Sequence, residues 1–270
     1  SFGLYQTQYD FFYNVKQISS KSGVVNPLFL MYYDAAIKEN GIKIDGEKYA
    51  NKSIFFYGIG AVLRKINPQT FIQDYVKEGV IEKIFKPKSK ISHENYAYAE
   101  VKHNLSTSFE MNIGLRAINW QEKREGVYFE PRLSVKKYFQ NFAIKLSNFS
   151  INQFVHQLSS SGGSLPNDVW ITANDYAKPV KSNQYSLSAM TNIPVGENKI
   201  YLEAAIYHKT LKNIVEYNNG QNLLTITEEL SNNATNLSDV FSVGRGESFG
   251  FELFAKYKST KLDATLSYTL

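Results

Sequence analysis

Apolar and polar residues alternate along most of this 270-residue chain. The two C-terminal segments carry the apolar sets Phe249, Phe251, Leu253, Ala255, Tyr257 and Leu262, Ala264, Leu266, Tyr268, Leu270. Successive side chains of a strand point to opposite faces, so this period of two predicts two strands with one apolar and one polar face each. The intervening KSTK predicts a hairpin turn.

The same alternation recurs upstream. Apolar sets lie within residues 55–63, 71–84, 97–101, 109–117, 133–139, 142–146, 185–189 and 200–206. Together with the C-terminal pair, they predict an all-β chain of about eleven strands.

The predicted links between strands differ in length in a regular way. Short links near Asn67, Asn104, Asn141, Gly196 and Ser259 alternate with longer ones at roughly 10–52, 85–91, 119–127, 149–183 and 209–247. Strands of about 9–11 residues joined in this rhythm are typical of an outer-membrane β-barrel, with short periplasmic turns and long extracellular loops. Lipid offers no partner to backbone groups, so we expect a closed antiparallel sheet whose apolar sets share one lipid-facing surface.

A soluble β-sandwich or jelly roll has strands that alternate in the same way. A soluble β-rich binding protein is therefore a second hypothesis. The barrel is favoured because compact soluble domains seldom carry several structureless loops of about thirty residues.

Composition narrows the function classes. The chain has no cysteine, which excludes disulfides and thiolate chemistry. A net charge of +5 spread over the chain is weak support for nucleic-acid binding, so we expect no nucleic-acid partner. No apolar run is long enough for a membrane helix, and the first residues show no targeting signal.

Several motifs resemble one family. The stretches YFEPRLSVKKYF (residues 128–139) and GRGESFGFELFAKYKSTKLDATLSYTL (244–270) closely resemble barrel segments of TonB-dependent outer-membrane receptors of the Bacteroidetes type. Between them, residues 165–170 and 178–185 resemble the long loop of that family, and residues 96–116 resemble another strand pair. The resemblance covers roughly residues 71–270, with the motifs in the order of the family.

The resemblance implies a receptor that binds a ligand at its extracellular loops and takes it across the outer membrane. Such receptors have a barrel of about 22 strands closed by a plug, through which TonB supplies energy. This sequence shows no plug and no TonB box, so we expect a fragment whose strands at Phe2 and Leu266 pair with strands outside this sequence. A surface lipoprotein lid is a further expected partner. A passive porin or a structural or adhesin barrel is the alternative within the membrane class.

Charged and glycine residues in the motifs have structural interpretations. Glu130 and Arg132 lie on one face of one strand, where we expect them to pair with plug or neighbouring charges in the lumen. Gly244, Gly246 and Gly250 have the spacing GxGxxxG and precede a strand, which favours strand-entry glycines over a nucleotide loop.

The predicted loops carry the candidate binding residues. Flat apolar faces that suit a sugar, a siderophore or a protein are offered by Trp120, Trp170, Tyr176 and Tyr217. Packing between loops or an aromatic girdle explains these residues equally well. The run KIFKPKSK, with Lys83, Lys86, Lys88 and Lys90, suits lipopolysaccharide phosphates, although a solvated charge run is the simpler interpretation.

Enzymatic chemistry has little support. The histidines, His93, His103, His156 and His208, lack the spacing of a metal site. His156 lies close to Ser159, Ser160 and Ser161 in sequence, but no acid partner or nucleophile elbow accompanies them. We therefore expect no enzyme activity, no metal and no cofactor, and the loops follow no code from which the ligand could be read.

Overall fold

The computed structural model describes residues 1–21, 24–74, 84–85, 89–122, 125–159, 168–218 and 241–270. These residues form strands, turns and irregular links without a helix. No helix among them is long and apolar enough to cross a membrane.

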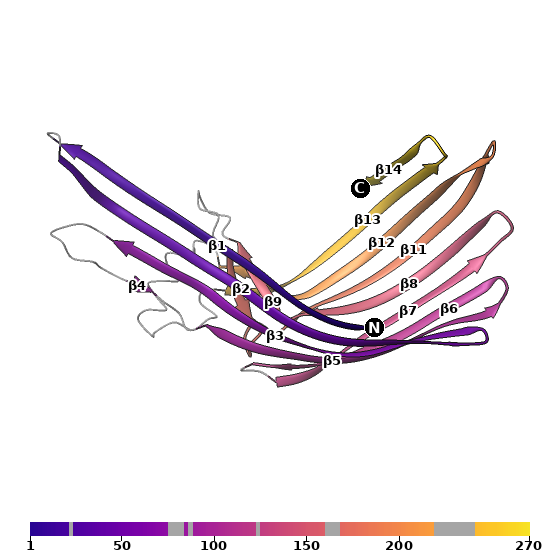
Figure 1. Cartoon of the computed structure of the whole chain (residues 1–270), viewed down its shortest axis with the longest axis horizontal. Coiled ribbons are helices and arrows are strands. Elements are labelled where there is room, and N and C mark those ends of the chain that lie inside the picture. The colour runs from indigo at the N-terminus through magenta and orange to yellow at the C-terminus, as the bar shows by residue number, and fades with distance from the viewer. Residues whose placement is uncertain (22–23, 75–83, 86–88, 123–124, 160–167, 219–240) are drawn as a thin grey trace.

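One antiparallel sheet contains almost all of the strands. Eleven of them follow one path in chain order: β1 (Phe2–Lys21), β2 (Val24–Ala50), β3 (Ser53–Asp74), β5 (Lys90–Ser106), β6 (Phe109–Gln121), β7 (Glu125–Tyr138), β8 (Phe142–Gln153), β11 (Val180–Val195), β12 (Asn198–Tyr217), β13 (Phe241–Lys258) and β14 (Asp263–Thr269). The two-residue β4 (Ile84–Phe85) pairs with β3, and β9 (Val155–Ser159) pairs with β10 (Asp168–Thr172) in a separate hairpin. The sheet is bent into a trough, with β1 and β14 as its outer strands (Figure 1).

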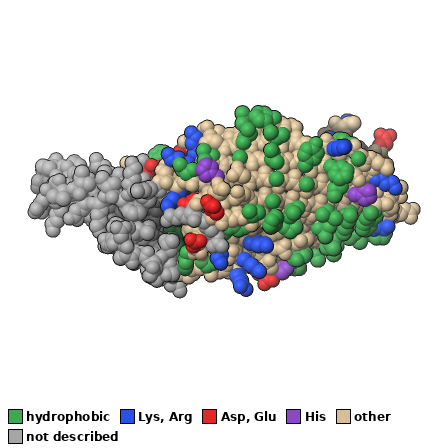
Figure 2. All heavy atoms as spheres, turned by 90° about the horizontal axis from the view of Figure 1, so that it is seen from below, with side chains coloured by type: hydrophobic (Ala, Val, Ile, Leu, Met, Phe, Trp, Pro, Cys, Tyr) green, Lys and Arg blue, Asp and Glu red, His purple; other side chains and the backbone are tan. Residues whose placement is uncertain are grey.

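Strand register confirms that the apolar sets share one face. Val135, Leu146, Leu187, Ile206 and Phe251 are directly opposite one another across five consecutive strands. Opposed residues of a sheet point to the same side, so these side chains form one continuous row. Figure 2 views the underside of the trough and shows apolar side chains spread over it. We call this surface the outer face and the opposite surface the inner face.

The short links follow the predicted rhythm with one error. Tight turns join strands at 107–108, 139–141, 196–197 and 259–262, and Gly196 has a φ of 60° that favours glycine. The predicted break near Asn67 is wrong, because β3 continues through it. A register shift opposite Ala35 leaves Pro68 outside the ladder pairs, so its missing N–H costs little there.

The predicted long links are also shorter than expected. The prediction of a loop over 10–52 is wrong, because β1 and β2 pair almost throughout and a turn at Asn51, with a φ of 51°, leads into β3. Between β6 and β7 only residues 122–124 lie outside strands. The predicted loops at 85–91 and 209–247 fall partly outside the described residues.

The region 149–183 folds inward. After β8 ends, residues 154–159 and 168–177 lie on the concave side of the trough, and we call them the inward segment. Its hairpin has β9 beside β12 and β10 beside β3, so it spans the trough from side to side (Figure 1). The buried apolar clusters lie where this segment meets the sheet.

Candidate functional site

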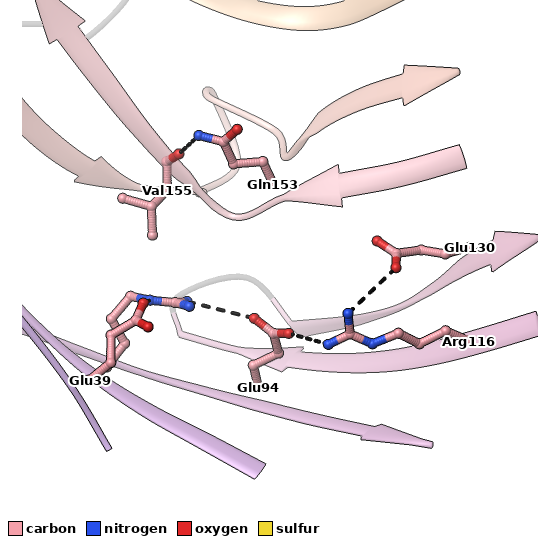
Figure 3. A network of polar contacts seen from close by, with 7 residues as sticks. Glu39, Glu94, Arg116, Glu130, Gln153 and Val155 are labelled. Carbon is pink, nitrogen blue, oxygen red and sulfur yellow. Dashed lines mark hydrogen bonds and ion pairs between the residues drawn. The ribbon is translucent and has the colours of Figure 1, made fainter. Parts of the chain in front are cut away.

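A row of alternating charges crosses the inner face beneath the inward segment. It consists of Glu39 on β2, Arg64 on β3, Glu94 on β5, Arg116 on β6 and Glu130 on β7, and we call it the inner-face ladder (Figure 3). Register places Glu39 opposite Arg64 and Arg116 opposite Glu130.

Glu94 connects the two halves of the ladder. Its carboxylate lies 3.7 Å from Nη1 of Arg64 and 3.0 Å from Nη2 of Arg116. Nη1 of Arg116 lies 3.8 Å from Oε2 of Glu130, and Arg64 contacts Glu39 directly. Each internal charge therefore lies between opposite charges, which offsets the cost of removing it from water.

The ladder is well buried at its β7 end. The side chain of Glu130 is 1% exposed, and its Oε1 accepts a hydrogen bond of 2.7 Å from the backbone N–H of Asn152. The guanidinium of Arg116 also lies 4.1 Å from the centre of the Tyr96 ring. Charge, hydrogen bonding and ring packing together fix these side chains.

Stacked aromatic rings fasten the start of the inward segment to the sheet. The Phe154 ring stacks on Trp120 with centroids 4.7 Å apart and meets the edge of Tyr128 at 5.0 Å. Trp120 and Phe154 are both buried. This contact sets where the chain leaves β8 and crosses the inner face.

The other end of the inward segment is held by polar contacts. Oδ1 of Asn174 accepts hydrogen bonds from the backbone N–H groups of Tyr176 and Ala177, as in an Asx turn. The Tyr176 hydroxyl donates to the carbonyl of Phe241 at 2.6 Å. Nε2 of the buried His156 lies 3.3 Å from the carbonyl of Ala177, to which it donates as the N–H tautomer. Burial lowers the pKa of His156, although hydrogen bonds to the backbone of residues 177 and 178 oppose this shift.

A cavity of about 400 Å³ lies between the ladder and the inward segment. Glu39, Arg64 and Glu94 supply its charged wall, and residues 151–155 with Trp170 supply the opposite wall. The edge of Trp170 meets Tyr9 of β1, with ring centroids 6.1 Å apart. Nε1 of Trp170 and Nδ2 of Asn152 are buried and have no hydrogen-bond partner among the described residues. The cavity thus combines two carboxylates and an arginine with apolar side chains, a set that suits a ligand with both polar and apolar parts.

Only one of the four aromatic residues singled out in the sequence lines this cavity. Trp170 lines the cavity, whereas Trp120 is 0% exposed at the end of β6, where its ring packs against Phe154. Cζ of Arg64 lies 5.9 Å from the centre of the Trp120 ring. Tyr176 and Tyr217 pack against the buried cluster that contains Phe241. In this structure these three rings hold the inward segment and the strands together.

The charged and glycine candidates occupy strand positions. Glu130 belongs to the ladder, while Arg132 is exposed and lines a smaller cavity with Lys43 and Asp45. Arg132 makes no ion pair with another described residue. Gly250 lies opposite Tyr207, whose ring would meet an added Cβ at 2.5 Å, so this glycine permits close packing within the sheet.

The described residues show no grouping of histidine, aspartate and glutamate that could hold a metal. His156 faces a backbone carbonyl, and residues 160 and 161 lie outside the described part, as do Lys83, Lys86 and Lys88. Nothing in this arrangement indicates bond chemistry.

Most of the ladder was missed in the sequence. Only Arg116 occupies a polar position of a predicted strand, which places it on the inner face. Glu39 falls in the predicted loop over 10–52, and Arg64 and Glu94 lie just outside the predicted strands. Alternation also does not say which charges meet, because this depends on the register between strands.

Comparison with known proteins agrees with this architecture. The family model described as TonB dependent receptor-like, beta-barrel, matches residues 5–270. A comparison with curated protein sequences found no match.

Solved structures share the fold at low sequence identity. The ferripyoverdine receptor of the outer membrane of Pseudomonas aeruginosa, bound to ferripyoverdine, is similar with a TM-score of 0.62 and 11% identity, over 100% of this chain and 38% of the receptor. A double mutant of the Serratia marcescens hemophore receptor, in complex with its hemophore and heme, is similar with a TM-score of 0.58 and 8% identity. The match covers 99% of this chain and 48% of that receptor. The ferric-catecholate import receptor from E. coli K12 is similar with a TM-score of 0.52 and 13% identity. The match covers 98% of this chain and 44% of that receptor.

The chain therefore spans less than half the length of these receptors. Their family consists of outer-membrane receptors and transporters, not enzymes. The family match over residues 5–270, the eleven-strand path and the continuous apolar outer face lead to the same conclusion. This chain belongs to the TonB-dependent receptor β-barrel family of the outer membrane.

Proposed function

We propose that this chain is part of the barrel wall of a receptor that binds a ligand on its extracellular side and takes it across the outer membrane with energy from TonB. One observation carries the proposal. The inward segment packs over the inner-face ladder and leaves a cavity of about 400 Å³, whose walls carry the charges of Glu39, Arg64 and Glu94 beside apolar side chains. A segment that narrows the lumen and offers donors and carboxylates suits selective binding better than free passage.

The whole protein would complete the wall to about 22 strands and enclose a plug, through which TonB acts. The motifs at residues 128–139 and 244–270 support membership of the Bacteroidetes type, with a surface lipoprotein lid as partner. The short turns would then face the periplasm and the inward segment would face the cell exterior.

The ligand class follows from the lining of the cavity and from the relatives. The similar structures are described with ferripyoverdine, with hemophore and heme, and as a ferric-catecholate importer. The guanidinium of Arg64 in the cavity wall favours a ligand that carries oxygen acceptors, such as an iron chelate. Trp170 would contact it, while Trp120, Tyr176 and Tyr217 would act by holding the inward segment in place.

The other hypotheses fare less well. A soluble sandwich is wrong, because the family is an outer-membrane barrel family and the apolar outer face is not covered by a second sheet of described residues. A passive porin or an adhesin barrel remains the competing function. Unlike the proposed receptor, neither would need energy from TonB.

Uptake by the full-length protein tests the proposal. Cells with and without TonB would be supplied with labelled ferric siderophores and heme, and accumulation would be measured alongside binding to isolated outer membranes. We expect uptake of one ligand that requires TonB and falls about tenfold in Trp170→Ala, given the loss of a ring contact. Tyr49→Ala, an exposed aromatic next to a short turn, is the matched control and should not change uptake.

TonB-independent uptake would indicate a passive pore. Binding without uptake in either strain would indicate an adhesin or a structural barrel.

A further inference from the structure

A shallow groove of about 570 Å³ crosses the outer face over β1, β2, β3 and β5. Its apolar part is formed by Leu4, Ile42, Ala61 and Leu63, and amides of Asn40 and Asn95 line its rim. Register places Leu4, Ile42, Ala61 and Asn95 in one row across the four strands. The groove is present because Ala61 is small between larger neighbours.

Two lysines stand one row beyond the groove. Lys38 of β2 and Lys65 of β3 are directly opposite each other on the outer face, between Gln8 and Ile91. Both are exposed, and neither makes an ion pair with a described residue. The carboxylate of Asp10 on the same face accepts a hydrogen bond of 2.6 Å from Gln8 instead.

Opposed like charges destabilise a sheet, since their Cβ atoms are only about 5 Å apart. A phosphate between the two ammonium groups would reverse the sign of this contribution. The adjoining groove has an apolar floor continuous with the membrane-facing surface, which fits a hydrocarbon chain, and Gln6 and His93 lie beside it together with the two asparagines. A lipid provides both groups in one molecule.

We propose that this part of the outer face binds a phosphate-bearing, acylated lipid of the outer leaflet, with phosphate between Lys38 and Lys65 and an acyl chain over Ala61. The proposal rests on the outer-membrane location of the family and on the proposed orientation of the short turns, but not on ligand uptake. Each lysine lies twelve residues from the end of its strand at the turn over residues 51–52, near the middle of β2 or β3. In a strand tilted by about 40° this is roughly 30 Å above the turn, which places both lysines at the outer boundary of an apolar band about 25 Å tall, in the outer leaflet.

The test uses the full-length receptor in nanodiscs of zwitterionic phospholipid doped with lipid A, dephosphorylated lipid A or an anionic glycerophospholipid. Retained lipid is measured by native mass spectrometry. The first variant combines Lys38→Gln and Lys65→Gln, and the second carries Ala61→Leu alone. The control is Lys136→Gln with Lys145→Gln, since these lysines are also directly opposite each other but lie on the inner face.

We expect the outer-face lysine variant to lose roughly 30-fold in retention of lipid A, at about 1 kcal/mol per lysine. Ala61→Leu should weaken lipid A and its dephosphorylated form alike, and the control should match the native protein. A similar melting temperature for all variants would show that folding is unchanged. If a variant fails to assemble, competition for the site is measured in the native protein instead. Soluble inorganic phosphate should not displace bound lipid A there.

Unchanged retention in the outer-face variant, an equal loss in the control, or displacement by inorganic phosphate would each overturn the proposal. A preference for the glycerophospholipid would overturn the outer-leaflet assignment. Because uptake is not measured, none of these outcomes bears on whether the receptor transports a ligand.

Discussion

At the scale of single residues, Glu94 is the side chain on which the inner-face ladder depends most. It is buried and pairs with both Arg64 and Arg116. Glu94→Gln removes the charge that both guanidinium groups face, and breaking a buried pair in this way costs about 3 kcal/mol. We expect the melting temperature of the assembled protein to fall accordingly.

The matched control for Glu94 is Lys102→Gln, which breaks a more exposed ion pair with Glu110 of 2.9 Å. Its effect should stay below about 1 kcal/mol. Equal effects of the two substitutions would contradict the structural importance of the ladder.

Glycine at position 60 is required by its neighbour. A Cβ at Gly60 would meet the ring of Tyr96, which lies under Arg116 and packs against the cluster around Trp120. Gly60→Ala should therefore lower the free energy of unfolding by about 1–3 kcal/mol. Gly244→Ala, where nothing lies within 4 Å, should have little effect, and chemical denaturation of both variants would show the difference.

At the scale of elements, the inward segment should behave as a unit that can leave the sheet while the barrel stays folded. Phe154→Ala removes its stacked contact with Trp120, and loss of a buried phenylalanine costs about 3–5 kcal/mol. Hydrogen exchange of residues 155–158 and 170–177 should then be at least about a hundredfold faster, while the strands keep their protection. Phe142→Ala, an exposed ring at a short turn, should leave exchange in the segment unchanged.

Docking of the same segment should depend on pH through His156. The pKa of this buried histidine is lowered, so the docked state favours the neutral ring. Docking is fully stable above the ordinary value of about 6.5, and it weakens as the pH falls from there toward the folded-state pKa. Exchange in residues 155–158, corrected for its intrinsic pH dependence, would report this, and His156→Gln should remove the effect. Docking that strengthens in acid would contradict it.

At the scale of the whole molecule, the two faces of the sheet should respond oppositely to charge. Leu187 is 45% exposed in the apolar row of the outer face, and arginine there should cost about 2–4 kcal/mol if lipid covers it. Gln184→Arg places the same charge on the inner face of the same strand and should be tolerated. The folded fraction in isolated outer membranes, read from heat-modifiable electrophoretic mobility, separates the two, and equal loss would argue against a lipid-facing outer face.

Positions with a period of two could be assigned from the sequence, and the structure confirms them in the strands that it describes, whereas most of the predicted strand at 71–84 lies outside the described residues. Alternation is a local property, because each side chain points to the opposite face from its neighbours whatever the strand pairs with. The error at Asn67 has a local cause too. Pro68 lies within β3 because a shift in β2 pairing removes the need for its N–H, and only the partner strand reveals that shift.

The candidate site was less accessible to sequence reasoning. Glu130 and Trp170 were recognised, but the partners of Glu130 depend on its register with the neighbouring strands, and Trp170 lies opposite Glu39 and Glu94, which come from strands far away in sequence. Trp120 was expected in a loop and lies buried at a strand end, because Phe154 folds back over it. Such contacts depend on where the chain turns after β8, which no periodicity encodes.

The sequence by itself therefore determined an antiparallel sheet of alternating strands, an apolar face for lipid and a polar face for the lumen. It could do so because lipid leaves backbone groups no alternative to full pairing. Only the tertiary structure decided which charges meet across the inner face, that residues 154–159 and 168–177 lie in the trough and that Lys38 and Lys65 stand side by side beyond a groove. The charge contacts and the lysine pair depend on register, since a shift of one residue would turn the side chains of a strand to the other face.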